Sequence, residues 1–371
     1  MPIVCSCLPC QGHAGKAHYE PVVFLVEKIA VAMSGGIDSL VAACLLKDMG
    51  HELIGIHFTT GYETVSHDDL YKMAEQIGMN LKIIDCKQAF ESLVVDYFIK
   101  TYQSGKTPNP CLVCNPQIKF GVLLDHAMSL GADGLATGHY AKISEGKDGR
   151  FHLIQAKDTQ KDQSYFLGFL SQTQLSQAVF PLGSMTKTEV RNLAAQKKIM
   201  PVSTKESQDI CFIREKNYRE FFKKRNILQN MPGPIEDVEG QIIGEHPGLS
   251  FFTVGQRRGI NCPASEPYYV VCIDQEKNRL VVGFKKDLYS AECKVEDISW
   301  IMPVPDKPLD LMTRIRYRHK PAASTLIPMD TGKDSKNRAI VRFHSPQAAV
   351  TPGQGAVFYM KDEVMGAGWI R

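Results

Sequence analysis

The chain has 371 residues, of which 44% are hydrophobic, and its 43 Lys and Arg nearly balance its 40 Asp and Glu. A chain of this length is too long to fold around one hydrophobic core of ordinary size, so two or three domains are predicted. The near balance of charge excludes a global positive field, so a nucleic-acid partner would have to be held by local basic patches.

Three classes of protein are not expected from the same composition. No apolar run is long enough to span a membrane, which argues against a membrane partner. No basic segment precedes the short apolar run near the N-terminus, so neither a secretory signal nor a mitochondrial presequence is expected. A cytoplasmic protein is therefore predicted, and its 11 cysteines are not expected to form a disulfide framework.

Residues 1–27 are predicted to be a disordered N-terminal extension. Cys5, Cys7 and Cys10 lie within it. A metal site at these three cysteines is the weaker alternative to a disordered tail.

From residue 28 onward, apolar strands alternate with amphipathic helices. This alternation predicts an α/β domain over residues 28–213, with a Rossmann-like, doubly wound parallel sheet. Thr186 and Glu189 have the spacing of a capping box and predict the start of a helix. Strands are expected at 29–33, 52–58, 81–85 and 135–140, and helices at 39–49, 68–77, 90–102, 118–130 and 187–198.

The stretch Ser34–Ser39 reads Ser-Gly-Gly-Ile-Asp-Ser between the first strand and the first helix. Glycine amides and a helix N-terminus there can bind an anion, and Asp38 makes sense if a divalent cation lies between its carboxylate and a phosphate. The loop is neither a Walker A motif nor a dinucleotide fingerprint. It resembles the PP-loop of ATP pyrophosphatases, which adenylate a substrate and release pyrophosphate. The alternative is a simple glycine turn that ends a strand.

Beyond residue 214 the helical pattern gives way to short β-branched runs separated by Gly and Pro. A small, mostly-β central domain is predicted over 214–284, and a compact C-terminal β-barrel over 285–371. Barrel strands are expected at 294–298, 313–318, 339–343 and 356–360, and residues 330–336 are expected to form a mobile hairpin tip.

One barrel segment reads Thr-Arg-Ile-Arg-Tyr-Arg-His-Lys. If it is a strand, period-two alternation places Arg314, Arg316 and Arg318 on one face, where they suit an RNA phosphate backbone. The alternative is an edge strand protected by its charges.

Cys111 and Cys114 are three residues apart where a helix is expected to begin, and Cys211 lies in a second loop. A helix N-terminus lowers thiol pKa values, so reactive thiols are predicted. Three thiols from two loops suggest one shared catalytic or cluster-binding site. A structural zinc site is the alternative, but it normally needs four ligands.

An ordered set of motifs from about residue 28 to the C-terminus resembles the tRNA-specific 2-thiouridylase (MnmA) family. The motifs are those at 34–39, 107–115, 136–140, 161–166, 207–212, 253–257 and 351–354.

This resemblance implies that ATP adenylates the 2-oxygen of a wobble uridine in tRNA, with Mg²⁺ offsetting the charge of the pyrophosphate. It implies that Cys211 carries a persulfide received from a sulfur-relay protein or a cysteine desulfurase. Cys114 would be the nucleophile and would end in a transient disulfide with Cys211, which requires an external reductant. The products would be 2-thiouridine, AMP and pyrophosphate.

The resemblance also implies binding residues. Those for ATP are Ala32, Met33, Ser34, Gly35, Gly36, Ile37, Asp38, Ser39, Phe58 and Gly138. Those around the target base are Asn109, Pro110 and Cys111, and those for tRNA are His139, Lys161, Asp162, Gln163, Arg316, Tyr317 and Gln354.

Two departures from the family pattern leave alternatives open. Many members have Asp where this chain has Cys111, so Cys111, Cys114 and Cys211 could instead ligate a 4Fe–4S cluster that performs the same thiolation. The segment after Phe58 is shorter than usual and lacks the common Lys-Asn-Trp sequence. The rival classes are a PP-loop enzyme that adenylates a small metabolite and a non-catalytic, zinc-stabilised RNA-binding protein.

Overall fold

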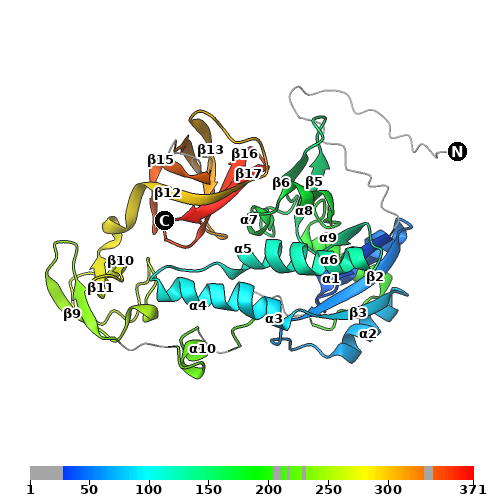
Figure 1. The fold of residues 1–371 in the computed structure, drawn as a ribbon, viewed down its shortest axis with the longest axis horizontal. Helices are drawn as coiled ribbons and strands as arrows, with labels where there is room; N and C mark the ends of the chain where they lie inside the picture. The colour runs from blue at the N-terminus through cyan, green and yellow to red at the C-terminus, as the bar shows by residue number, and fades with distance from the viewer. Residues whose placement is uncertain (1–27, 204–209, 215–217, 228–230, 330–336) are drawn as a thin grey trace.

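The computed structural model describes residues 28–203, 210–214, 218–227, 231–329 and 337–371. The predicted N-terminal extension with Cys5, Cys7 and Cys10, and the predicted hairpin tip at 330–336, lie outside these ranges. Figure 1 shows an α/β part, a small β-sheet and a β-barrel arranged around two long helices. In the described residues, no helix combines the length and apolar character needed to cross a bilayer.

A five-stranded parallel sheet with the order β3-β2-β1-β4-β7 organises the α/β part. The order reverses between β1 and β4, and ligands in such sheets bind beyond the carboxyl ends of the strands at this point. The predicted parallel sheet is confirmed, and its strands are β1 (Lys28–Ala32), β2 (Glu52–Thr59), β3 (Asn80–Asp85), β4 (Gly134–Ala136) and β7 (Ala178–Val179).

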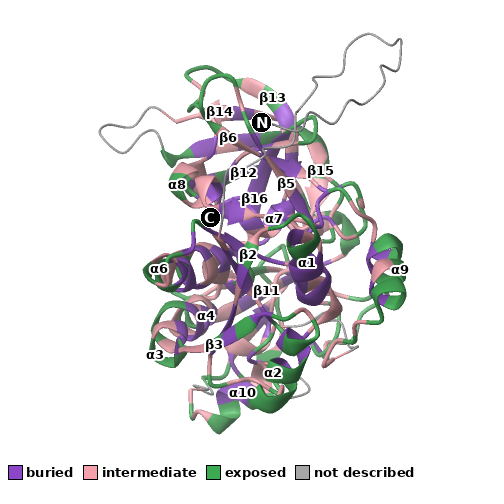
Figure 2. Cartoon of the chain, turned by 90° about the vertical axis from the view of Figure 1, so that its right-hand side faces the viewer, coloured by how far each residue is buried: buried purple, intermediate pink, exposed green. Residues whose placement is uncertain are grey.

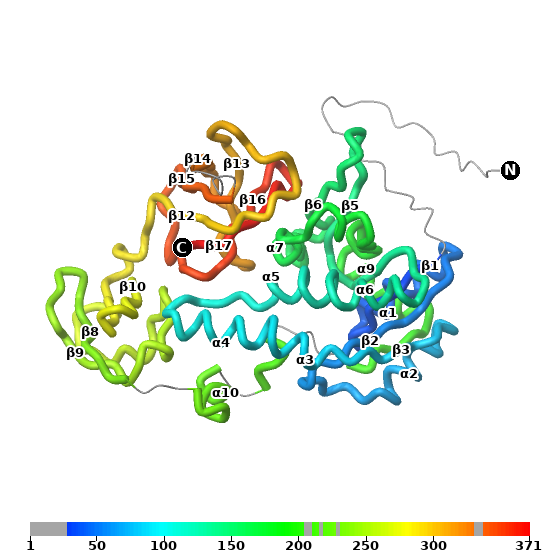
Figure 3. The backbone as a smooth tube through the Cα atoms, viewed as in Figure 1, coloured from blue at the N-terminus to red at the C-terminus, as the bar shows by residue number. Residues whose placement is uncertain are grey.

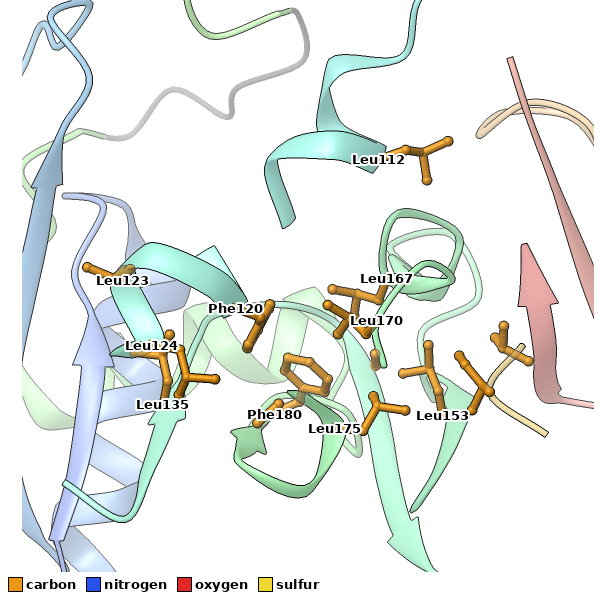
Figure 4. Close-up of a cluster of buried hydrophobic side chains, with 14 of the residues drawn as sticks. Leu112, Phe120, Leu123, Leu124, Leu135, Leu153, Leu167, Leu170, Leu175 and Phe180 are labelled. Carbon is orange, nitrogen blue, oxygen red and sulfur yellow. The ribbon is translucent and has the colours of Figure 1, made fainter. Parts of the chain in front are cut away.

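Helices cover both faces of this sheet, as expected for a doubly wound fold. Leu40, Leu70 and their neighbours on α1 (Ile37–Asp48) and α2 (His67–Glu75) pack against one face. Phe120, Leu123 and Leu124 pack against the other face, and Figure 4 shows them facing Leu135 of β4. The buried residues in Figure 2 accordingly lie along the strands, whereas the outer surfaces of α2 and α9 (Lys187–Lys197) are exposed.

Two long helical segments extend away from the sheet (Figure 3). The first comprises α3 (Lys87–Phe90), the π-helical turn η1 (Glu91–Val95) and α4 (Asp96–Gln103). The second comprises α5 (Pro110–Cys114), η2 (Asn115–Leu123) and α6 (Leu124–Ser129), so it begins eight residues before the expected start at 118. Proline at the first position explains this start, since its missing N–H has no partner to lose there.

Shorter elements complete the α/β part. They are the hairpin β5 (Ala141–Glu145) and β6 (Phe151–Gln155), with α7 (Ser164–Leu167), α8 (Gln172–Ser176) and α10 (Tyr218–Lys224). The predicted capping box is confirmed, because Thr186 Oγ1 accepts from the Glu189 amide and the Glu189 carboxylate accepts from the Thr186 amide.

The small sheet has the order β10-β11-β8-β9 and confirms the mostly-β prediction for the centre of the chain. Its elements are β8 (Gly233–Glu236), β9 (Ile242–His246), η3 (Leu249–Phe251), β10 (Tyr269–Asp274) and β11 (Arg279–Gly283).

The C-terminal part is a closed antiparallel barrel, as predicted, because β12 pairs with both β15 and β17. Its elements are η4 (Lys285–Leu288), β12 (Tyr289–Trp300), β13 (Leu309–Arg314), β14 (Ala322–Pro328), β15 (Ala339–Ala348), β16 (Gly355–Met360) and β17 (Glu363–Ile370). The sequence patterns did not indicate β14 or β17. The hairpin β5–β6 of the α/β part also pairs with β17, so one sheet joins the two parts.

Candidate active site

The loop between β1 and α1 is held by hydrogen bonds among its own residues. The Ser34 amide and hydroxyl each lie 3.3 Å from Ser39 Oγ, which itself donates to the Gly36 carbonyl at 2.9 Å. A Cβ atom on Gly138 would lie 2.9 Å from the Ser39 nitrogen, so only glycine allows the segment after β4 to approach this closely. The loop lies at the switch point of the sheet, where the sequence predicts phosphate binding.

The carboxylate of Asp38 is bound by a lysine that the motif analysis missed. Lys187 Nζ lies 2.8 Å from both Asp38 carboxylate oxygens, and the Tyr140 hydroxyl donates to one of them at 2.8 Å. The Lys187 side chain is only 8% exposed. The cation beside Asp38 is therefore this ammonium group, and a divalent cation is not needed to explain the carboxylate. No local pattern marks Lys187, because it lies 149 residues from its partner.

The remaining residues predicted for ATP occupy the same edge of the sheet. Ala32 ends β1, Ile37 begins α1, and the Met33 carbonyl accepts from His57 Nδ1 at 2.7 Å. Phe58 is partly buried and packs in a cluster that also contains Cys114. The strand ends thus bring the phosphate loop and the cysteine helix to one edge.

A turn of the barrel holds the segment that precedes Cys111. Gln354 Nε2 donates to the carbonyls of Thr107 and Pro108, both at 3.1 Å, and the Thr107 amide donates to the Pro352 carbonyl at 2.8 Å. Gly353 has φ +86°, and a Cβ there would lie 2.8 Å from the Thr107 oxygen. Gln354, predicted to contact tRNA, therefore has a partner inside the protein.

Residues predicted around the target base start the cysteine helix. The Asn109 amide donates to the Tyr97 hydroxyl at 3.4 Å, and Pro110 is the first, buried residue of α5. Asn115 Nδ2 donates to the Cys111 carbonyl at 3.1 Å and to the Phe166 carbonyl at 2.9 Å. These contacts fix the direction in which α5 leaves the barrel.

The three thiols predicted to share a site are neighbours. Cys114 interacts electrostatically with Cys211 and Cys111, and Cys211 with Cys111. Ile210, Phe212 and Ile213, which flank Cys211, pack in the same aromatic cluster as Cys114. The tertiary structure thus joins the two loops that carry the thiols.

The prediction of lowered thiol pKa values is wrong. Burial raises the pKa of Cys114 to about 12 and that of Cys211 to about 11, and it also raises the pKa of Cys111. Solvent reaches the Cys111 side chain, yet surrounding protein atoms still desolvate its sulfur. The ammonium of Lys119 opposes the shift at all three thiols but does not overcome desolvation.

His139 is predicted to contact tRNA, but its side chain is buried. Its Nε2 lies 3.2 Å from Lys119 Nζ and its Nδ1 lies 2.7 Å from Thr137 Oγ1. Burial and the nearby ammonium hold the pKa of His139 well below its usual value, so the ring is neutral. In the neutral ring, His139 Nε2 accepts a hydrogen bond from the Lys119 ammonium, so His139 helps to position that lysine.

Two other residues predicted for tRNA have internal partners. Asp162 is 2% exposed and accepts hydrogen bonds from the Ala156 amide and the Ser164 hydroxyl. Gln163 Oε1 accepts from the Tyr140 amide at 2.9 Å. Lys161 lies beside them and is partly exposed.

The predicted row of three arginines on one strand face is wrong. β13 ends at Arg314, and the chain turns immediately, with the His319 amide donating to the Arg316 carbonyl. Arg314 points inward and pairs with Asp162 at 3.3 Å. Arg316 donates to the Ala348 carbonyl at 3.2 Å, and the ring of Tyr317 packs 4.4 Å from that of Phe166.

Among residues 28–203, 210–214, 218–227, 231–329 and 337–371, no group of three or more His, Cys, Asp or Glu side chains is arranged to hold a metal ion. The cluster alternative for Cys111, Cys114 and Cys211 stays a prediction. The motif residues Ser207, Gln208 and Asp209 fall outside the described ranges.

Family models match three consecutive stretches of the chain. A tRNA methyl transferase HUP domain matches residues 27–215, a tRNA methyl transferase PRC-barrel domain residues 219–284, and an aminomethyltransferase beta-barrel domain residues 290–370. A 4-thiouridine synthetase in complex with RNA and ATP aligns with 54% of this chain and 50% of its own, with 16% identity and a TM-score of only 0.33.

Two curated relatives cover nearly the whole chain. The tRNA-specific 2-thiouridylase MnmA of Desulfosudis oleivorans is 49% identical over 344 residues, which cover 92% of this chain and 94% of the relative. That of Geobacter metallireducens is 43% identical over 360 residues, which cover 93% and 96%. The chain therefore belongs to the tRNA-specific 2-thiouridylase (MnmA) family.

Proposed function

We propose that the chain replaces the 2-oxygen of a wobble uridine in tRNA with sulfur, in a reaction driven by ATP. The observation that supports this proposal is that Phe58, near the end of β2 beside β1 and its following loop, packs in one aromatic cluster with Cys114 and with the residues that flank Cys211. Adenylation and sulfur transfer must act on the same carbon, so both sets of groups are needed within reach of one base.

In the activation step, the uridine 2-oxygen attacks the α-phosphorus of ATP, and pyrophosphate leaves. The amides of the phosphate loop and the N-terminus of α1 bind the phosphates. Lys187 neutralises Asp38, which would otherwise repel them. Mg²⁺ commonly accompanies nucleotide phosphates, but both Asp38 oxygens are occupied by Lys187, so this carboxylate is not preformed as its ligand.

In the sulfur step, the terminal sulfur of a Cys211 persulfide attacks the activated C2 carbon, and AMP leaves. The Cys114 thiolate then attacks Sγ of Cys211, which breaks the sulfur–sulfur bond and leaves 2-thiouridine with a Cys114–Cys211 disulfide. The sulfur comes from a persulfide donor, such as a sulfur-relay protein or a cysteine desulfurase. Lys119 favours the thiolate at each position, because its ammonium lowers the pKa of every thiol in the group.

The alternative is a 4Fe–4S form of the same reaction, with Cys111, Cys114 and Cys211 as cluster ligands. Among the described residues, no group of three or more His, Cys, Asp or Glu side chains is arranged to hold a metal ion. No step is therefore assigned to a cluster, and iron and sulfide analysis of anaerobically purified protein distinguishes the two forms.

The test uses the full chain with unmodified tRNA, ATP and a persulfide donor. Wild-type protein is expected to release pyrophosphate and to form 2-thiouridine at the wobble base, measured by mass spectrometry of tRNA digests. Cys114→Ser and Cys211→Ser are expected to abolish 2-thiouridine but to retain pyrophosphate release. Cys272→Ser, an exposed cysteine on β10, is the matched control and should behave as wild type.

Three results would contradict this proposal. Loss of pyrophosphate release in both cysteine variants would remove the assigned roles of these thiols. AMP formation that needs no tRNA would instead favour an enzyme that adenylates a small metabolite, and the absence of any turnover would favour a binding protein. A steep decrease of tRNA affinity with salt is expected if phosphate contacts dominate.

A further inference from the structure

The turn after β2 is a segment in which the sequence departs from the family pattern, and the proposed mechanism gives it no role. The Glu63 carboxylate closes this turn, because it accepts hydrogen bonds from the Thr60 hydroxyl at 2.8 Å and from the Gly61 amide at 3.0 Å. Gly61 has φ +87°, a conformation that favours glycine. The turn is therefore a well-defined extension of β2 beyond Phe58.

Tyr62, within this turn, is held by two charged side chains. Its hydroxyl donates to Glu91 Oε2 at 2.8 Å and accepts from the guanidinium of Arg225. Arg225 also pairs with Glu91, and its Nη2 lies 3.3 Å from Glu91 Oε2. Burial raises the pKa of Tyr62 to about 12, so the hydroxyl stays protonated and donates to Glu91 at neutral pH. These bonds fix the position of the Tyr62 ring.

The Tyr62 ring packs against the segment that carries Cys211. Its centroid lies 5.8 Å from that of Phe212, the residue that follows Cys211. A second contact comes from Glu63, whose carbonyl accepts a hydrogen bond from Arg214 Nη2 at 2.5 Å. The turn after β2 therefore contacts both Phe212 and Arg214, which lie just beyond Cys211 in the sequence.

The same aromatic cluster contains the other thiol of the proposed cycle. Cys114 packs in it together with Phe212 and with Phe58, the strand residue predicted to contact ATP. A displacement of Tyr62 would therefore move Cys211 relative to both the ATP edge of the sheet and Cys114. Misplacement of a reacting group by about 1 Å can slow a reaction about 100-fold.

We propose that Tyr62 is a positioning residue for sulfur transfer, an inference that rests on the proposed function. Its ring and hydroxyl hold the Cys211 segment against the end of β2, so that a persulfide on Cys211 reaches the carbon activated beside the phosphate loop. Arg214 supports the same contact through Glu63. Tyr62 does not touch the reacting atoms in this role, and adenylation does not depend on it.

The first test measures the approach of Cys211 to Cys114 without tRNA or ATP, so it is independent of the proposed function. Every protein carries Cys111→Ser, which leaves Cys114 as the only thiol of the tryptic peptide 107–119. Diamide, a two-electron oxidant, is added to reduced full-length protein. Mass spectrometry then follows the disulfide between peptides 107–119 and 206–214, whose rate of formation reports how often the two sulfurs meet.

We expect Tyr62→Leu to form this disulfide at least about tenfold more slowly than the parent, because it loses both the ring and the hydroxyl. Tyr62→Phe keeps the ring against Phe212 and should slow the rate only about fivefold, as expected for one lost hydrogen bond. Arg214→Met removes the second contact, at an exposed side chain, and should also slow the rate about fivefold. Tyr71→Leu is the matched control and should leave the rate unchanged, because Tyr71 lies on α2 and is 43% exposed.

The second test distinguishes positioning from a general loss of structure. In a single turnover with unmodified tRNA, ATP and a persulfide donor, Tyr62→Leu is expected to release pyrophosphate at the wild-type rate. The same variant should form 2-thiouridine at least about tenfold more slowly. Tyr62→Phe should recover part of the lost 2-thiouridine rate. A protein that had merely lost its fold would lose both products together.

Two results would overturn the inference. One is a Tyr62→Leu protein that forms the Cys114–Cys211 disulfide as fast as the Tyr71→Leu control. The other is a parallel loss of pyrophosphate release and 2-thiouridine in Tyr62→Leu, with no recovery in Tyr62→Phe. If the wild type makes no 2-thiouridine, the proposed function fails, and the disulfide rates measured without tRNA alone decide the inference.

Discussion

At the scale of single residues, the pairing of Lys187 with Asp38 is predicted to support both folding and ATP binding. Lys187→Met leaves a carboxylate without its cation beside the phosphate loop. Asp38 is 32% exposed, so the loss in unfolding free energy should be about 1–3 kcal/mol, below the value for a fully buried pair. Repulsion of phosphate should weaken ATP binding by at least about tenfold. Urea unfolding and calorimetric titration measure the two effects.

A matched control joins the same two helices. Lys197 of α9 pairs with Asp48 of α1 at the surface, where the side chains are 41% and 47% exposed. Lys197→Met should leave both the unfolding free energy and the ATP affinity close to their wild-type values, because exposed ion pairs contribute little. Equal effects of the two substitutions would contradict a special role for Lys187.

The raised pKa of Cys114 gives a second prediction. At pH 8 a thiol with a pKa of about 12, rather than the ordinary 9.0, has roughly 10³-fold less thiolate. Alkylation of Cys114 in the folded protein should therefore be slow and rise about tenfold per pH unit up to about pH 11. Rates are read from the peptide 107–119, with urea-denatured protein as reference. A folded-state rate that levels off near pH 9 would contradict burial as the cause.

The same shift links pH to folding. Because the folded pKa lies above the unfolded value of 9.0, the stability linked to the protonated Cys114 thiol is fully present below pH 9. This contribution is lost as the pH rises toward about 12.

At the scale of elements, the barrel turn with Gln354 is predicted to order the start of α5. Gln354→Ala removes two hydrogen bonds to the carbonyls of Thr107 and Pro108. Amide hydrogen exchange over residues 107–114 should accelerate about thirtyfold, because the two lost bonds together contribute about 2 kcal/mol. The rate of 2-thiouridine formation should fall while ATP affinity is unchanged.

Gln347→Ala provides the comparison for this turn. The Gln347 side chain is partly exposed and donates to the Ser345 carbonyl of its own strand. Exchange in 107–114 should be unaffected by this change. An unchanged exchange rate in Gln354→Ala would show that the turn does not hold α5.

The elements also show what a sequence can reveal. The phosphate loop and the capping box at Thr186 and Glu189 depend on neighbours within a few residues, so local patterns suffice to find them. The barrel segment after Arg314 alternates like a strand, yet the chain turns there, and the Arg314 side chain at the end of β13 pairs with Asp162, 152 residues away. An alternating pattern of neighbouring residues carries no information about a contact with a residue so far away in the sequence.

The cysteines illustrate the same limit in their chemistry. A helix N-terminus lowers a thiol pKa, and the prediction of reactive thiols depended on that effect. Desolvation by the surrounding aromatic cluster has the opposite sign and is larger at Cys114. Its size depends on residues from several distant segments, so it appears only in the folded structure.

At the scale of the whole molecule, the ion pair between Asp162 and Arg314 is predicted to couple the barrel to the α/β part. The two side chains are 2% and 12% exposed. Arg314→Met leaves a buried carboxylate without its cation and should lower the unfolding free energy by about 3–5 kcal/mol. Calorimetry should then resolve separate transitions for the two parts, where wild type shows a single one.

The surface offers a comparison within the barrel. Arg342 pairs with Glu292 at 3.5 Å, and these side chains are 61% and 51% exposed. Arg342→Met should keep one transition and shift the unfolding free energy by less than about 0.5 kcal/mol. A single, unshifted transition in Arg314→Met would show that other contacts dominate the coupling.

The pairing of β6 with β17 carries a consequence for how such proteins can be divided or recombined. In this pairing Glu363 aligns with Ile154, and Val364 aligns with Leu153. The side chains of Leu153 and Val364 are fully buried. A truncated protein that lacks the last strands would expose the unpaired, apolar edge of β6, which would favour self-association. A chimera that takes its C-terminal barrel from a related protein would fold only if the β5–β6 hairpin came from that same protein.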